Sequence, residues 1–109
     1  MERRGFTEKD WKLFRKKISG WQENYMEKLC KEYIELLSGD ESASEKFWKL
    51  EKKIKQDKKK SGVIVDMRRS QMLYDITDLI QEGAIGFNDL KEFSEELQET
   101  INFFIQGRT

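Results

Sequence analysis

The chain contains no proline among its 109 residues, and this absence constrains the fold more than any other feature of the sequence. Proline is the strongest helix breaker, and without it apolar residues can recur at three- and four-residue spacing over long stretches. They do so in five stretches, which the glycines mostly separate. The pattern predicts an all-α fold, a compact bundle of four to five helices. Residues 1–109 are expected to form a single helical domain in which 1–5 and 106–109 are frayed.

Capping residues and glycines set the limits of the predicted helices. Thr7, followed by Asp10, and Ser42, followed by Glu45, match the capping box that begins many helices. Gly20 is expected to end the first helix, because glycine often follows a helix C-terminus. The predicted helices cover residues 7–19, 21–38, 42–60, 63–82 and 86–105.

The core is expected on the second, fourth and fifth helices, with the third helix the most solvated. Cys30 shares an apolar face with Leu29 and Tyr33, so it is predicted to be a buried structural residue. Trp48 lies off the apolar stripe of the third helix and is expected to be partly exposed. The segment Val63-Ile64-Val65 is assigned to the start of the fourth helix, since no second strand-like run exists to pair with it.

The residue types that most catalytic and metal sites need are missing from the sequence. It has no histidine, the commonest metal ligand and general base near neutral pH, and only one cysteine. Asp66, Asp75, Asp78 and Glu82 fall at helical spacing and are expected to line a solvated helix face. No glycine-rich phosphate loop or calcium-binding loop is recognised. We therefore expect no enzyme activity, no catalytic residue, no metal and no cofactor.

The sequence shows no recognisable targeting or membrane-spanning segment. Its first residues carry alternating charge rather than an apolar signal-peptide core, and no apolar run approaches the roughly 18 residues of a membrane span. A single cysteine cannot form an intramolecular disulfide, which is typical of a reducing compartment. The expected location is the cytoplasm, and no membrane is expected among the partners.

Charge is distributed unevenly, although 21 basic and 21 acidic residues give a formal net charge of zero. Lysines dominate residues 49–60, whereas acids dominate residues 75–99, where Lys91 is the only basic residue. Both stretches can be explained as solubilising faces that attract one another. The acids also repel each other, and a basic partner would relieve that repulsion. The candidate partner-binding residues on this acidic face are Asp89, Glu92, Glu95, Glu96 and Glu99.

The lysine-rich stretch supports an alternative, the binding of nucleic acid. Lysines give salt-sensitive and non-specific affinity for phosphates, and the neighbouring arginines are better suited to reading bases. The candidate residues for this alternative are Lys49, Lys52, Lys53, Lys58, Lys59, Lys60, Arg68 and Arg69.

A resemblance to a known family is carried by two stretches, EKDWKLFRKKISGWQENYMEKLCKEYIELLSG and IQEGAIGFNDLKEFSEELQETINFF. They resemble the short, soluble helical proteins of Gram-positive bacteria and their mobile elements that are often labelled "multidrug transporter". The resemblance extends over residues 6–104 and implies a helical protein carried with mobile DNA. Such cargo includes inhibitors of host defence, among them anti-CRISPR proteins.

The predicted function is non-enzymatic binding of a protein or ribonucleoprotein, in the form of an anti-CRISPR-like inhibitor of a host defence nuclease. One alternative is a nucleic-acid-binding accessory protein that uses the lysine-rich helix. Another is a structural homodimer. Strong salt dependence of polynucleotide binding would favour the first alternative, and a concentration-dependent mass would favour the second.

Overall fold

The computed structural model describes residues 5–108, and within them it contains helices and loops but no strand. The all-α fold predicted from the sequence is confirmed. Four α-helices and two short 3₁₀ helices follow one another in this part of the chain. They are α1 (Glu8–Leu37), α2 (Ala43–Asp57), η1 (Arg69–Gln71), α3 (Met72–Gln81), η2 (Phe87–Leu90) and α4 (Glu95–Arg108).

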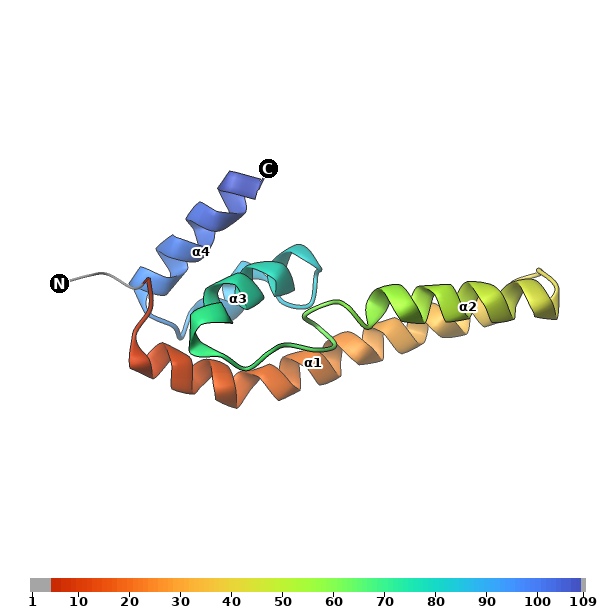
Figure 1. Cartoon of the computed structure of the whole chain (residues 1–109), viewed down its shortest axis with the longest axis horizontal. Coiled ribbons are helices and arrows are strands. Elements are labelled where there is room, and N and C mark those ends of the chain that lie inside the picture. The colour runs from red at the N-terminus through yellow and green to blue at the C-terminus, as the bar shows by residue number, and fades with distance from the viewer. Residues whose placement is uncertain (1–4, 109) are drawn as a thin grey trace.

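Helix α1 organises the molecule, because its 30 residues run along most of the long axis (Figure 1). Helices α3 and α4 pack with its N-terminal half to form a small bundle. Helix α2 lies beside its C-terminal half, and residues 25–60 form an antiparallel arm that we call the hairpin. The molecule therefore measures 60 × 29 × 22 Å, a bundle from which the hairpin projects.

Helix α1 passes through Gly20 without interruption, so the helix end predicted there is wrong. Trp21 continues the apolar stripe across this point, and its ring centroid lies 6.2 Å from that of Phe14. Gly20 also lacks the positive φ with which glycine ends many helices, whereas Gly83 after α3 has a φ of 80°. The two predicted N-terminal helices are therefore one.

The core lies in the bundle. The N-terminal half of α1 contributes to it in the place where the sequence predicts a contribution from the second predicted helix. Helix α2 supplies no residue to this core, which agrees with the prediction that this segment is the most solvated. The buried apolar cluster consists of Trp11, Phe14, Ile18, Met72, Ile76, Leu79, Ile85, Leu90, Phe93, Leu97 and Ile101.

The last two predicted helices are shorter than expected. Residues 64–68 have no regular secondary structure, as suits the β-branched run Val63-Ile64-Val65, and regular helix begins only at η1 and α3. The fifth predicted helix is divided into η2 and α4 by a turn at 91–94. The turn is held by Ser94, whose backbone N–H and hydroxyl both donate to Asp10.

Asp10 connects the start of α1 to the start of α4. It forms the predicted capping box with Thr7, in which each backbone N–H donates to the other side chain. It also accepts hydrogen bonds from Ser94 N, at 2.8 Å, and Ser94 Oγ, at 2.6 Å. Burial acts to raise the pKa of Asp10, but the hydrogen bonds from Ser94 and Thr7 outweigh burial and lower it. Asp10 is therefore a buried carboxylate that joins two helix ends.

Both described ends of the chain are anchored, which differs from the predicted fraying of Gly5 and residues 106–108. The Gly5 N–H donates to Glu96 Oε1 at 3.3 Å. Helix α4 continues to Arg108, whose guanidinium lies 2.6 Å from an Asp78 oxygen and 2.8 Å from Gln81 Oε1. The predictions for residues 1–4 and 109 lie outside the described residues.

The continuity of α1 predicts opposite effects of alanine at two glycines. Gly20→Ala should raise the free energy of unfolding by about 0.5–1 kcal/mol, because Gly20 is exposed in mid-helix with nothing within 4 Å of an added Cβ. Gly83→Ala, the matched control, should lower it by about 1–2 kcal/mol because of its positive φ. Denaturant unfolding monitored by circular dichroism measures both, and destabilisation by Gly20→Ala would contradict the continuous helix.

Candidate protein-binding hairpin

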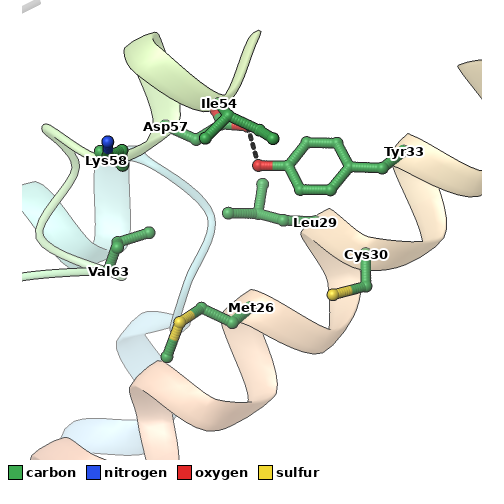
Figure 2. A pocket seen from close by; sticks show the side chains of 8 residues that line it. All are labelled: Met26, Leu29, Cys30, Tyr33, Ile54, Asp57, Lys58 and Val63. Carbon is green, nitrogen blue, oxygen red and sulfur yellow. Dashed lines mark hydrogen bonds between the residues drawn. The ribbon is translucent and has the colours of Figure 1, made fainter. Parts of the chain in front are cut away.

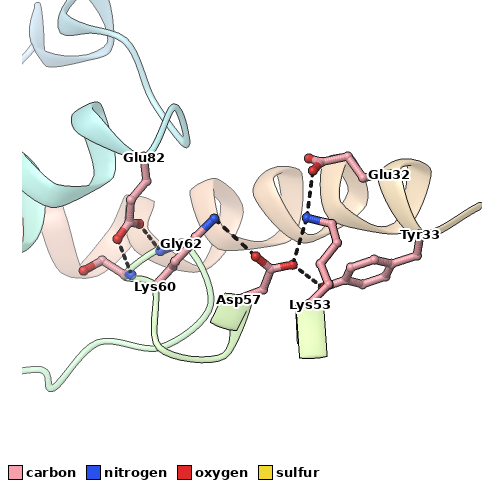
Figure 3. A network of polar contacts seen from close by, with 8 residues as sticks. Glu32, Tyr33, Lys53, Asp57, Lys60, Gly62 and Glu82 are labelled. Atoms are coloured by element: carbon pink, nitrogen blue, oxygen red, sulfur yellow. Dashed lines mark hydrogen bonds and ion pairs between the residues drawn. The ribbon is translucent and has the colours of Figure 1, made fainter. Parts of the chain in front are cut away.

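Asp57, at the end of α2, is the centre of the polar network that closes the hairpin (Figure 3). It is 3% exposed and accepts a 2.7 Å hydrogen bond from the Tyr33 hydroxyl. The ammonium groups of Lys53 and Lys60 lie 3.4 and 3.2 Å from its carboxylate oxygens. Lys53 also pairs with Glu32 of α1 at 3.0 Å. Charged and polar groups from both helices therefore hold the hairpin closed.

The network shifts the ionisation of both residues at its centre. Burial acts to raise the pKa of Asp57, but the hydrogen bonds from Tyr33 and Lys60 and the charges of both lysines outweigh burial and lower it. Burial, together with the hydrogen bond to Asp57 and its negative charge, raises the pKa of Tyr33. Asp57 is therefore ionised and Tyr33 neutral at physiological pH.

Glu82, at the end of α3, ties the hairpin to the bundle. Its carboxylate accepts hydrogen bonds from the backbone N–H groups of Ser61 and Gly62, each at 3.1 Å (Figure 3). The Gln22 side chain of α1 donates to the Ser61 carbonyl at 3.0 Å. Gly62 is required here, because a Cβ would overlap the Tyr25 ring. The prediction that Glu82 lines a solvated face is therefore wrong, since it binds the backbone that leaves the hairpin.

The hairpin has a side of ion pairs and an apolar side. The ion pairs Lys53–Glu32 and Lys49–Glu41 lie on the first side. On the other, apolar residues recur at i, i+4 and i+11 in α1 and at i and i+7 in α2, spacings that return to one side of a helix. These residues, which we call the apolar side, are Met26, Cys30, Leu37, Phe47 and Ile54.

A cavity of about 220 Å³ opens on the apolar side near the base of the hairpin (Figure 2). Cys30 lines it and is exposed, so the predicted burial of this residue is wrong. The same stripe does bury Leu29, which is 4% exposed, but no third helix in the described part of the chain covers Cys30. The cavity is lined by Met26, Leu29, Cys30, Tyr33, Ile54, Asp57, Lys58 and Val63.

The outer part of the hairpin exposes large apolar side chains. Ile34 and Leu37 of α1 are 63% and 45% exposed, and Phe47 and Trp48 of α2 are 62% and 64% exposed. The two aromatic rings meet edge to face with their centroids 5.0 Å apart. The prediction that Trp48 is partly exposed is confirmed. Tryptophan is enriched among the residues that dominate binding energy, so this surface is the candidate binding site.

Half of the lysines in the candidate nucleic-acid site pair with acids of the hairpin itself. These three are Lys49, Lys53 and Lys60. The other three are exposed, and the structure shows no ion pair for them among the described residues. They are Lys52, Lys58 and Lys59.

The two arginines of that candidate site lie outside the hairpin and are also engaged. Arg68 pairs with Asp66 in the segment that precedes η1. Arg69 pairs with Glu8 of α1 at 3.1 Å, and its guanidinium lies 5.7 Å from the centre of the Trp11 ring. The structure therefore does not unite the lysines and arginines in one set of free positive charges.

Two members of the candidate acidic face stabilise turns of the bundle. Asp89 caps η2 by accepting a 2.8 Å hydrogen bond from the Gly86 N–H. Glu92 lies 3.5 Å from the ammonium group of Lys17 on α1. These two acids therefore have favourable partners in the chain, which was not expected from the sequence.

The other three acids lie on α4. Glu95 and Glu96 occupy its first turn, where the helix dipole stabilises negative charge, and Glu96 also accepts the Gly5 hydrogen bond. Glu99 is exposed and borders a shallow hollow of about 330 Å³ with Phe87 and Asn102. Glu95 and Glu99 are thus the exposed acids of this face that are most available to a partner.

Asp75 on α3 differs from the solvated acid expected at this position. Burial, with the charges of Asp78 and Asp66, raises its pKa to about 6. Its Oδ2 atom is buried and has no hydrogen-bond partner among residues 5–108. A carboxylate of this kind can be an acid or base in catalysis. However, it lines neither the hairpin cavity nor the hollow on α4.

Comparison of the chain with known protein families, curated proteins and solved structures finds no match. Residues 5–108 contain no cluster of three or more histidine, cysteine, aspartate or glutamate residues that could hold a metal ion. Over the same residues, no helix is both long and apolar enough to cross a membrane. The candidate site is therefore argued from the geometry of the hairpin.

The charge on Asp57 predicts a pH-dependent loss of stability on substitution. At pH 7, Asp57→Asn should lower the free energy of unfolding by about 1–3 kcal/mol, because Tyr33 and Lys60 lose a charged partner. The folded-state pKa lies below the usual 3.8, so this stabilisation is present above about pH 4 and disappears as the pH falls through the folded-state pKa.

Urea unfolding between neutral and acid pH measures the effect. The difference between wild type and Asp57→Asn should shrink as the pH falls. Glu35→Gln, on an exposed position of α1, is the matched control and should change stability little at any pH. A difference for Asp57→Asn that stays constant with pH would show that its charge does not hold the hairpin closed.

Proposed function

We propose that the protein acts without catalysis and binds a protein partner through the hairpin. The observation that supports this most directly is a set of large, exposed apolar side chains on an arm that is fixed at its base. Exposed apolar patches commonly mark interaction sites. The contacts of Asp57 and Glu82 hold the arm in one direction, so little conformational entropy is lost when it binds.

The chemistry of the hairpin surface favours a protein over a nucleic acid. Phe47 and Trp48 already meet edge to face, so the two rings do not offer two free parallel faces on which successive bases could stack. The lysines of the hairpin do not form one group of free charges that could bind phosphates, since Lys49 and Lys53 are held in ion pairs. An apolar centre with a polar rim is instead the usual anatomy of a protein–protein interface.

The resemblance of the sequence to mobile-element proteins supports a more specific form of the proposal. In this form the partner is a ribonucleoprotein of a host defence system, and the protein is an anti-CRISPR-like inhibitor. Glu95 and Glu99 are exposed on α4, and Glu99 lines a hollow there, so both acids can meet a basic nucleic-acid channel of the partner. The hairpin then supplies contact area, and the acids compete with nucleic acid.

The proposed role of the hairpin predicts that its aromatic pair is needed for capture of a partner. Tagged protein would be crosslinked in cells of the host, and the captured proteins would be quantified by mass spectrometry. Phe47→Ala/Trp48→Ala should reduce capture about tenfold or more, as expected for the removal of residues that dominate an interface. Phe103→Ala is the matched control, because Phe103 of α4 is 73% exposed but lies outside the hairpin.

Equal capture by the wild type, the double variant and Phe103→Ala would contradict the proposal. Far-UV circular dichroism of the double variant should be unchanged, since Phe47 and Trp48 are exposed.

The inhibitor form of the proposal predicts which charges matter. Glu95→Gln/Glu99→Gln should weaken binding to a ribonucleoprotein partner, because the attraction to a basic channel is lost. Lys52→Gln/Lys59→Gln should leave that binding nearly unchanged. Titration of both variants at two salt concentrations measures this. If the lysine variant alone loses binding, and binding falls steeply with salt, the nucleic-acid alternative is correct.

A further inference from the structure

The cavity and Phe47 lie at opposite ends of the same side of the hairpin. On α2, Phe47 is separated from Ile54 and Lys58 of the cavity by seven and eleven residues, which is close to two and three whole helical turns. On α1, Met26 and Cys30 of the cavity align in the same way with Leu37 near the turn. One apolar side therefore carries an exposed ring at its outer end and a cavity at its inner end.

The cavity is large enough for a phenyl ring. Its volume is about 220 Å³, and an apolar cavity of about 150 Å³ is known to hold benzene. Its walls include Leu29 and Ile54, and Asp57 is already satisfied by Tyr33 and Lys60. An apolar ring entering it would therefore leave the Asp57 carboxylate with its partners.

Charge also differs between the two ends of the hairpin. The turn at the outer end carries Asp40 and Glu41, of which Glu41 pairs with Lys49, whereas the inner end carries Lys58 and Lys59. Two hairpins placed antiparallel would bring each acidic turn to the basic inner end of the other. Between these ends, Glu51 and Lys55 already pair at 2.8 Å.

We propose that the apolar side is covered by the hairpin of a second copy of this chain, antiparallel to the first, with Phe47 of each copy in the cavity of the other. The proposal rests on the proposed function, in which the hairpin is a protein-docking element, and names an occupant for one side of it. The contact is isologous, which means that both copies use the same surface. A single two-fold axis near the middle of α2 relates the insertion of each Phe47 ring to that of the other. Two hairpins joined in this way make a four-helix arrangement in which each pair covers the other.

Sedimentation equilibrium over a range of protein concentrations tests the association. The wild type should approach twice the chain mass of 13.1 kDa at high concentration. Phe47→Ala should raise the dissociation constant about tenfold or more, as for a central aromatic residue of an interface. Phe103→Ala on α4 should leave it unchanged. A wild type that stays monomeric at all concentrations would overturn the proposal.

The single cysteine provides a direct test of the register. Cys30 lines the cavity, so Phe47→Cys should form a disulfide between two copies under mild oxidation, seen as a dimer on a non-reducing gel. The dimer should disappear in Phe47→Cys/Cys30→Ala. Trp48→Cys is the matched control and should crosslink far less, because position 48 points about 100° away around α2. Equal crosslinking of the two cysteine variants would overturn the proposed register.

Charge exchange tests the antiparallel orientation. Asp40→Lys and Lys58→Glu should each weaken association, since each places like charges together across the contact. The double variant Asp40→Lys/Lys58→Glu should recover most of the loss, because the pair is restored with its signs exchanged. Additive loss in the double variant would overturn the orientation.

The outcomes separate this inference from the proposed function. Capture of a different protein that depends on Phe47 and Trp48, with a monomeric wild type, would overturn the second copy and retain the docking hairpin. A wild type that neither associates nor captures a partner through these residues would overturn both.

Discussion

The length of α1 is the constraint on which the rest of the structure depends. One uninterrupted helix of 30 residues is longer than the bundle it serves, so its C-terminal half extends beyond α3 and α4. Helix α2 then has α1 as its main neighbour, and it folds back along the projecting part. A projecting hairpin follows directly from the continuation of the apolar stripe through Trp21, because nothing at Gly20 interrupts it.

Polar contacts add to the burial of Tyr25 and Leu29 in holding the hairpin together. A two-helix arm offers little interior, and its largest buried contribution from α2 is the carboxylate of Asp57. That group is stabilised by Tyr33, Lys53 and Lys60, while Glu82 binds the backbone where the chain leaves the arm. These contacts occupy one side and the base of the hairpin. The apolar residues of the other side are left for a partner, which is why the same arrangement that stabilises the arm also supports a binding role.

The helical class and several caps could be predicted from the sequence, because periodicity and capping are local. The capping box of Thr7 and Asp10 and the exposure of Trp48 are examples. The errors have non-local causes. Cys30 shares a stripe with buried residues, but only the tertiary arrangement shows that no helix covers it. Glu82 and Asp89 look like solvated acids until their backbone partners are known. Leu29 and Tyr33 are spaced along α1, and Ile54 and Asp57 along α2, in a heptad-like way. This spacing was the sequence signal from which the contact between the two helices of the hairpin could have been predicted.

The bond between Asp10 and Ser94 joins residues that are 84 positions apart, and this separation sets an order of folding. The hairpin needs only contacts between residues 25 and 60, so its parts can meet soon after they leave the ribosome. The bundle, by contrast, must close a loop that spans most of the chain before Phe14 can be covered by Leu97 and Ile101. During synthesis the N-terminal half of α1 therefore carries an uncovered apolar stripe for longer than any other segment. Premature termination before α4 would leave that stripe exposed to chaperones and proteases.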